Sequence, residues 1–336
     1  MPNTPHPNPV CIIGNLNIDL ILRDVPAMPA WGQEVFGGGR LQVSSGQAGY
    51  LAFALRRLGI PTSLVANVGD DAYGRQILSD LQASGADTRA VEASPGSRTG
   101  ITVAIVRPDG ERAFVSDLGC LADFSPANVQ RGWAQVEEAP IACLVGLFCL
   151  PGLSLKEAAR LLGQARAAGK QTMLDTGWDT HNWPSATLAG MRALLGEVTL
   201  FMPNWDEARA ITGQDTLKAA ARQLQDLGPE TVVIKCGAQG SYALRRGQAC
   251  QVAPRSVRVY DAVGAGDVFN AGFLAGLRQG WPMEACLSFG NSVASLYISR
   301  EQDRFPTLAA ALATAQEYPA LRGMAYAADE MEVSLD

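Results

Sequence analysis

Short apolar runs recur along the chain, separated by segments whose apolar residues follow a helical spacing. The runs, rich in Val, Ile and Leu, lie at 10–22, 62–69, 142–148, 171–175, 199–203 and 231–235. Runs of this length and composition predict strands buried on both faces. The segments between them mostly end on glycine, which together with their spacing indicates helices. This alternation predicts an α/β fold with a mostly parallel central sheet and helices on both sides.

Two stretches interrupt the alternation. Residues 100–117 contain two strands with alternating apolar positions around an Asp-Gly turn, which predicts a β-hairpin. Residues 19–43 are rich in Gly and Pro and contain only short extended pieces. Because neither stretch fits strand–helix alternation, we expect both to form a small β-flap, or lid, outside the main sheet.

Length and charge narrow the class of protein. The chain has 336 residues, and its 27 basic and 33 acidic side chains give a formal charge of −6. This weak acidic balance argues against nucleic acid or an anionic membrane as a partner. No apolar run approaches the ~18 residues of a membrane span, and the N-terminus lacks the features of a signal peptide. We therefore expect a cytoplasmic protein with a flexible tail at 1–9 and a C-terminal helix and weakly attached tail at 311–336.

Histidine and cysteine usage restricts the chemistry. The only two histidines, His6 and His181, leave little for a Ser-His-Asp triad or a multi-histidine metal site. The seven cysteines include no C-x-x-C pair, and several lie in apolar runs, so we expect buried free thiols. Chemistry in this chain must therefore rely on carboxylates, backbone amides and glycine turns.

The most informative stretch is VYDAVGAGDVFNAGFLAGL at 259–277, an extended segment followed by a glycine turn and a long helical pattern. Small residues at a helix N-terminus leave backbone N–H groups bare, so Gly264, Ala265 and Gly266 can hold an anion. Asp267, beside that anion, can accept a proton from an attacking hydroxyl. This pairing is what phosphoryl transfer to an alcohol requires.

Two other nucleotide motifs are excluded. A dinucleotide-binding G-x-G-x-x-G would need glycine where Phe269 stands, and it belongs in a first βαβ unit, which argues against an NAD-dependent oxidoreductase. A phosphate-binding G-x-x-x-x-G-K-[ST] loop is nearly matched at 163–171, but the spacing is one residue too long and Gln171 replaces the hydroxyl.

Residues 261–267 read DAVGAGD, which resembles the D-T-x-G-A-G-D signature of the ribokinase-like (PfkB) carbohydrate kinases, with Ala262 in place of Thr. The resemblance extends over roughly residues 10–310. It implies a three-layer α/β/α domain with a mostly parallel sheet and a lid. It also implies that Asp267 is the catalytic base and that the amides of residues 264–266 form the anion hole.

Two further matches concern the phosphoryl acceptor. The segment GNLNID at 14–19 resembles G-x-x-N-x-D, whose aspartate binds substrate hydroxyls, and SGQAGY at 45–50 resembles the substrate motif G-G-x-x-x-N. A carboxylate can accept hydrogen bonds from two hydroxyls at once. The substrate residues implied are Asn17, Asp19, Gly46, Gln47 and Tyr50. Tyr50 replaces a sugar-binding asparagine, so it would stack on a ring or narrow the pocket.

Other matches imply ATP and Mg²⁺. The segment NWDE at 204–207 matches N-x-x-E, which organises Mg²⁺ and its waters around the phosphates, so Glu207 would act through those waters. The segment KCGAQG at 235–240 resembles a turn under the nucleotide. The nucleotide residues implied are Asn204, Glu207, Lys235, Gly237, Gly240 and Asn291. The segment DTGWD at 175–179 also faces the site, with a role either near the metal or in a turn.

A monovalent-cation site is where the chain departs from the family. The family often builds this site from the region of Asp261 and from carbonyls of a later loop that contains glycine. Here that loop, 300–306, reads REQDRFP and has no glycine. Asp261 is the candidate K⁺ ligand, but the loop gives no basis for predicting potassium dependence.

These features predict an ATP-dependent kinase acting on a hydroxyl of a small sugar or polyol. A nucleoside kinase of the same fold is an alternative, which Tyr50 favours by stacking a base. A non-catalytic sugar- or nucleotide-binding regulator is another, which the intact motif at 264–267 disfavours. The sequence does not identify the acceptor. Exposed lid strands offer an edge to a second subunit, so we expect a homodimer.

Overall fold

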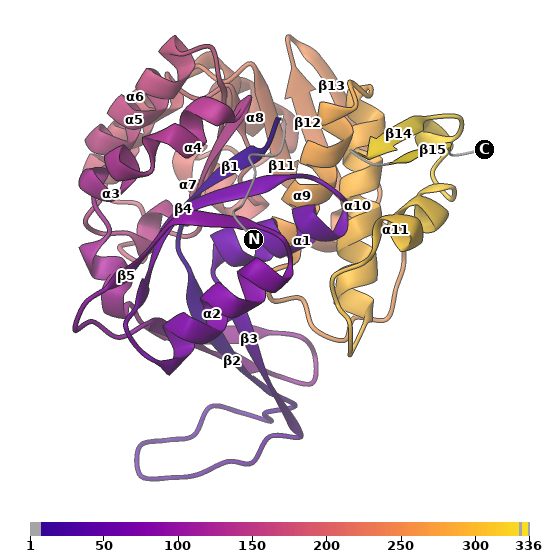
Figure 1. Ribbon diagram of the computed structural model, residues 1–336. Coiled ribbons are helices and arrows are strands. Elements are labelled where there is room, and N and C mark those ends of the chain that lie inside the picture. Colours follow the sequence, from indigo (N-terminus) through magenta and orange to yellow (C-terminus); the bar gives the residue numbers. More distant parts are fainter. Residues whose placement is uncertain (1–7, 329–330, 335–336) are drawn as a thin grey trace.

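The computed structural model describes residues 8–328 and 331–334, and its centre is a nine-stranded sheet (Figure 1). Seven neighbouring strands run parallel, and β12 and β13 add an antiparallel hairpin at one edge. In sheet order the strands are β13 Gln248–Val252, β12 Ser241–Arg245, β11 Thr231–Lys235, β10 Leu200–Phe201, β9 Gln171–Asp175, β8 Ile141–Val145, β1 Val10–Gly14, β4 Thr62–Gly69 and β5 Asp87–Ser94. The predicted mostly parallel sheet is confirmed.

Helices cover both faces of this sheet because its central strands send apolar side chains to both sides. In β1, Ile12 belongs to one apolar core, whereas Cys11 and Ile13 belong to the other. The first core lies under α1 Gln47–Arg57, α2 Ala72–Ala83, α9 Ala265–Arg278, α10 Met283–Ser299 and α11 Leu308–Ala315. The second lies under α3 Pro126–Arg131, α4 Trp133–Glu138, α5 Leu155–Ala167, α6 Ser185–Leu195, α7 Trp205–Thr212 and α8 Leu217–Asp226. The predicted three-layer α/β/α fold is confirmed (Figure 1).

The lid is a separate four-stranded sheet in the order β3-β2-β6-β7. Its strands are β2 Asn17–Arg23, β3 Gly39–Ser45, β6 Gly100–Val106 and β7 Arg112–Asp117. The predicted hairpin is the antiparallel pair β6–β7, and β6 also pairs in parallel with β2. The two stretches that interrupt the strand–helix alternation therefore meet in one sheet. It projects from the body of the molecule, with the long β2–β3 connection at its tip (Figure 1).

The C-terminal segment, expected as a helix and a weakly attached tail at 311–336, is held more firmly than a tail would be. The side chain of Tyr326 is fully buried against Trp281 and Phe289, and its hydroxyl donates to the carbonyl of Leu58 at 2.8 Å. The indole of Trp281 donates to the carbonyl of Ala325 at 2.9 Å. One aromatic residue near the chain end, Tyr326, therefore anchors the segment to the first core. The flexible tail expected at 1–9 lies mostly on residues 1–7, outside the described residues.

Two further findings concern the cysteines and the membrane-spanning capacity of the helices. All seven cysteines are free in the structure, but the prediction of buried free thiols holds in full for only four of them: Cys11, Cys120, Cys143 and Cys286 are buried, whereas Cys149, Cys236 and Cys250 are half-buried. Burial raises the pKa of the Cys11 thiol to about 12 and that of Cys120 to about 11, which disfavours the thiolate form in both. In the described part of the chain, none of the helices combines the length and apolar character needed to span a lipid bilayer.

Candidate active site

The residues predicted to face the nucleotide lie where the parallel strands end. Strand β9 ends at Asp175 and β11 at Lys235, and Asn204 forms a β-bridge with Lys235 just beyond β10. The carboxyl ends of parallel strands meet at one edge of a sheet, which brings these side chains together. Strand β2 begins at Asn17, shortly after β1 ends at Gly14, so the lid leaves the body from the same edge.

The first turn of α9 carries the residues predicted to bind an anion. Gly264 is the N-cap in a left-handed conformation (φ 80°), and a Cβ there would lie 2.6 Å from the ring of Tyr50. The amide of Ala265, predicted to face the anion, instead donates to a carbonyl of the preceding turn at 3.2 Å. Within residues 8–328, the N–H groups of Gly266 and Asp267 have no acceptor. These amides and the positive end of the helix can bind an anion.

Asp267 lies in this first turn and is only 7% exposed. Burial raises the pKa of Asp267 well above its ordinary value, and the neighbouring Asp175 carboxylate raises it further. The Lys235 ammonium opposes that rise, as does the Gln47 side-chain amide, which donates to Asp267 Oδ1 at 3.4 Å. A buried carboxylate of raised pKa is suited to accept a proton from a hydroxyl.

A buried ion pair stands beside that turn. Lys235 contacts the carboxylate of Asp175, which also accepts a hydrogen bond from Asn270 Nδ2 at 2.6 Å. A Cβ on Gly266 would lie 3.5 Å from Lys235 Nζ, so the ammonium supplies positive potential next to this turn. In the structure Asp175 forms an ion pair with Lys235, and its expected role near the metal or in a turn stays a prediction. The sequence reading missed Asn270, although its place three residues after Asp267 puts both on one face of α9.

Asn204 and Glu207 form a capping box at the start of α7. Asn204 Oδ1 accepts from the amide of Glu207 at 2.8 Å, and Glu207 Oε2 accepts from the amide of Asn204 at 2.9 Å. Glu207 is buried, and that burial raises its pKa to about 7, with Asp175 adding to the rise and Lys235 opposing it. The motif is thus a helix cap and also the source of a buried acid.

The site suits a divalent cation that keeps its water. The Asp175 carboxylate raises the pKa of Glu207 and that of Asp267, and the Lys235 ammonium opposes both rises, so three acids lie around one ammonium. Yet in the described ranges no three Asp, Glu, His or Cys side chains converge tightly enough to ligate a metal directly. This arrangement fits a Mg²⁺ ion bound through phosphate oxygens and water, with Glu207 behind the water.

On the acceptor side, Asp19 is buried at the lid strand β2. Its Oδ1 accepts from Asn17 Nδ2 at 2.8 Å, and its Oδ2 accepts from the Tyr50 hydroxyl at 2.7 Å. Burial raises the pKa of Asp19, and these hydrogen bonds oppose the rise. Gly46 is the N-cap of α1, where a Cβ would lie 2.2 Å from the carbonyl oxygen of Asn15. The glycine is therefore required by contact between two backbone segments.

Tyr50 is not available for stacking. Its ring is 3% exposed and packs against Gly264, Tyr297 and Phe305, while its hydroxyl is bound to Asp19. Of the two roles considered from the sequence, stacking on a base does not agree with this packing, and narrowing the pocket stays a prediction. Because the Tyr50 ring is buried, its presence no longer favours a nucleoside as the acceptor.

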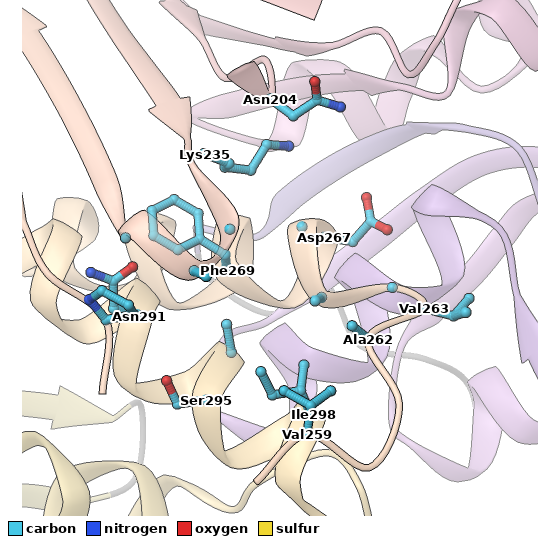
Figure 2. A pocket seen from close by; sticks show the side chains of 18 of the residues that line it. Asn204, Lys235, Val259, Ala262, Val263, Asp267, Phe269, Asn291, Ser295 and Ile298 are labelled. Atoms are coloured by element: carbon cyan, nitrogen blue, oxygen red, sulfur yellow. The ribbon is translucent and has the colours of Figure 1, made fainter. Parts of the chain in front are cut away.

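A cavity of about 830 Å³ extends from Asn204 and Lys235 past the first turn of α9 (Figure 2). Asn204 and Lys235 lie on one side of it, Asp267 at the start of α9, and Val259 and Ile298 at an apolar end. All six predicted nucleotide residues and residues 264–267 line it. Of the five predicted acceptor residues, all within the described ranges, only Gln47 does. Two lid residues that the sequence reading missed, Arg112 and Phe114, also line it.

Asn291, which is expected near adenine, also links β13 to α10. Its Nδ2 donates to the carbonyls of Val252 at 3.2 Å and Ala253 at 3.4 Å, and so holds the end of β13 against α10. Its position between this strand end and the apolar side chains of α10 places it at the cavity wall.

Comparisons with known proteins agree with this architecture. The sequence profile described as pfkB family carbohydrate kinase matches residues 8–310. An uncharacterized sugar kinase of Archaeoglobus fulgidus is 31% identical over 247 residues, which are 73% of this chain and 94% of that protein. The structure of Arabidopsis thaliana ribokinase complexed with ribose and ATP has a TM-score of 0.78 at 23% identity, covering 92% of this chain and 99% of that one. An E. coli structure in complex with ATP and Mg²⁺ has a TM-score of 0.79 at 21% identity, covering 93% and 100%.

Proposed function

The chain belongs to the pfkB family of carbohydrate kinases, phosphotransferases with a hydroxyl acceptor, and from this premise we propose that it transfers the γ-phosphoryl group of ATP to a small sugar or polyol. The observation that carries the proposal is Asp267. This buried carboxyl of raised pKa lies in the same helical turn as free amides and opens onto a cavity of about 830 Å³. Base and anion hole are thus held by one rigid element.

In this mechanism the acceptor hydroxyl lies between the lid and α9. Asp19 accepts hydrogen bonds from sugar hydroxyls with the lone pairs left free by Asn17 and Tyr50. Asp267 takes the proton of the attacking hydroxyl. The hydroxyl oxygen forms a bond to the γ-phosphorus while the bond from that phosphorus to the leaving ADP oxygen breaks. The amides of Gly266 and Asp267 stabilise the transferring group.

The nucleotide would lie along the cavity, with its phosphates near Lys235 and its base toward Val259 and Ile298. ATP in the Arabidopsis ribokinase structure and ATP with Mg²⁺ in the E. coli structure support these ligands. When bound, Mg²⁺ neutralises phosphate charge. In this chain Asn204 and Glu207 would orient its waters, while the ammonium of Lys235 offsets the charge of Asp175.

The acceptor class is tested by an ATP-consumption screen over sugars, sugar phosphates, sugar acids and nucleosides. We expect turnover with a small carbohydrate and none with nucleosides, because the buried Tyr50 ring offers no stacking surface for a base. Turnover restricted to nucleosides would overturn the sugar assignment. Ligand binding without any turnover would favour the regulator that the sequence left open.

We also propose that two copies of the chain pair through their lids to form a homodimer. Strand β7 is an edge of the lid sheet and exposes Phe114 and Val115, and the β2–β3 connection exposes Trp31 and Phe36. Unpaired edges with exposed apolar side chains are suited to strand pairing with a second copy. Light scattering should give twice the mass of one chain for the wild type and one chain for Val115→Lys. A monomeric wild type would refute the proposal.

A further inference from the structure

A buried ion pair lies directly before the anion hole. Arg304, in the loop that follows α10, places Nη1 2.8 Å from Asp261 Oδ2, and both side chains are less than 10% exposed. Arg304 Nη2 donates to the carbonyl of Asp261 at 3.1 Å and approaches the carbonyl of Val263 at 3.5 Å. One carboxylate oxygen and two backbone carbonyls therefore converge on a single guanidinium.

These are the ligands that a hard cation prefers, but the space between them is filled. The candidate K⁺ ligand named from the sequence, Asp261, does not fit a free cation here. An ion bound to it would have to displace a fixed positive charge that already contacts the same oxygens. The disagreement arises because the loop at 300–306 contributes an arginine side chain to the cluster.

The guanidinium cannot leave this position without disturbing the core. Its central carbon lies 4.2 Å above the ring of Tyr297, whose ring packs in turn against Phe305. Arg57 fixes the loop from outside by binding the carbonyl of Phe305 at 3.0 Å and the carboxylate of Asp303 at 2.7 Å. Arg304 is therefore a rigid part of the site.

The cluster also controls the backbone that leads to the anion hole. The other oxygen of Asp261, Oδ1, accepts from the amide of Val263 at 3.0 Å, and the Tyr297 hydroxyl donates to the carbonyl of Val263 at 2.9 Å. Val263 immediately precedes Gly264, the N-cap of α9. Arg304 thus holds, through two carbonyls and one carboxylate, the turn that sets where the amides of Gly266 and Asp267 point.

We propose that Arg304 is a built-in cation that positions this turn, so that the enzyme works without a monovalent cation. The inference rests on the proposed function only in that the turn binds the transferring phosphoryl group. Arg304 contacts neither substrate in this proposal and is a positioning residue. Its loss leaves a buried carboxylate and carbonyls facing one another, which shifts the amides and lowers kcat more than the affinity for ATP.

The first test compares wild type and Arg304→Ala in potassium chloride and in tetramethylammonium chloride at equal ionic strength. We expect the wild-type kcat to change by less than about twofold between the salts. Arg304→Ala should lose roughly 10- to 100-fold in kcat and regain several-fold in potassium, since the vacated cluster then accepts an alkali ion. Arg304→Lys, which keeps a charge, should be nearly insensitive to potassium. Arg300→Ala is the control, because the Arg300 side chain lies at the start of the same loop and donates to the carbonyl of Asp303 at 3.5 Å, away from Asp261.

The second readout is the melting temperature in the same two salts, which needs no turnover. Wild type should melt at the same temperature in both, and Arg304→Ala should melt higher in potassium. Stimulation of wild-type kcat by potassium, a wild-type melting temperature raised by potassium, or an unchanged kcat in Arg304→Ala would each overturn the proposal. If no acceptor is ever found, the proposed function fails while the melting data still decide the role of Arg304.

Discussion

Asp267→Asn is expected to lower kcat by about a thousandfold. The substitution keeps the size of the side chain and its proximity to Gln47 but removes the group that takes the proton. The amides of the α9 turn remain, so the dissociation constant of ATP should stay within about threefold of the wild-type value. Steady-state kinetics and calorimetric titration of ATP measure the two quantities separately.

Asp206→Asn provides the matched control, because Asp206 is an exposed acid in the first turn of a neighbouring helix, α7. It should leave kcat unchanged within about twofold. Substantial turnover by Asp267→Asn would exclude Asp267 as the base.

The dependence of kcat/KM on pH tests the role of Asp267 independently. Because the base acts when deprotonated, kcat/KM should fall as the pH drops through the raised pKa of Asp267. Lys235 holds that pKa down, so Lys235→Met should move the acid limb of the profile to higher pH. An unmoved limb would show that another group sets it.

Gly264→Ala is expected to lower kcat by about 100-fold and the free energy of unfolding by about 2 kcal/mol or more. The backbone there has φ 80°, and the new Cβ would lie 2.6 Å from the buried ring of Tyr50. Because that ring is held by Asp19 and by its aromatic neighbours, the turn must move, and the amides of the anion hole move with it.

Gly247→Ala separates the effect of the left-handed backbone from the effect of the contact with Tyr50. Gly247 has the same φ of 80° in the β12–β13 turn, with no heavy atom within 4 Å of an added Cβ. It should lose about 1 kcal/mol of stability and keep the wild-type kcat. Chemical unfolding and initial-rate assays compare both variants. Equal kcat values for Gly264→Ala and Gly247→Ala would show that the contact with Tyr50 does not position the anion hole.

Much of the fold could be read from local pattern. The buried runs that became β1, β8 and β9 are apolar on both faces, and the hairpin β6–β7 follows from its Asp-Gly turn. The turn at 264–267 is local in the same sense, because a helix N-terminus exposes its amides wherever it packs. The capping box at Asn204 and Glu207 is likewise formed within one turn.

Other features required segments far apart in the sequence. Asn270 binds Asp175, 95 positions away, and the Tyr326 hydroxyl binds the carbonyl of Leu58, 268 positions away. Arg304 forms an ion pair with Asp261. The sequence marked Asp261 as a candidate cation ligand but did not show that an arginine side chain lies against it. Nothing in the neighbours of these residues indicates the partner.

The sequence by itself therefore determined the layers of the fold, the lid strands and the glycine turn at the start of α9. These depend on apolar periodicity, glycine conformation and helix termini, which act over a few positions. Only the tertiary structure decided that Tyr50 is locked to Asp19 and that Arg304 occupies the cation cluster. The physical reason is that burial and charge pairing are set by whichever distant side chain packing brings within a few ångströms.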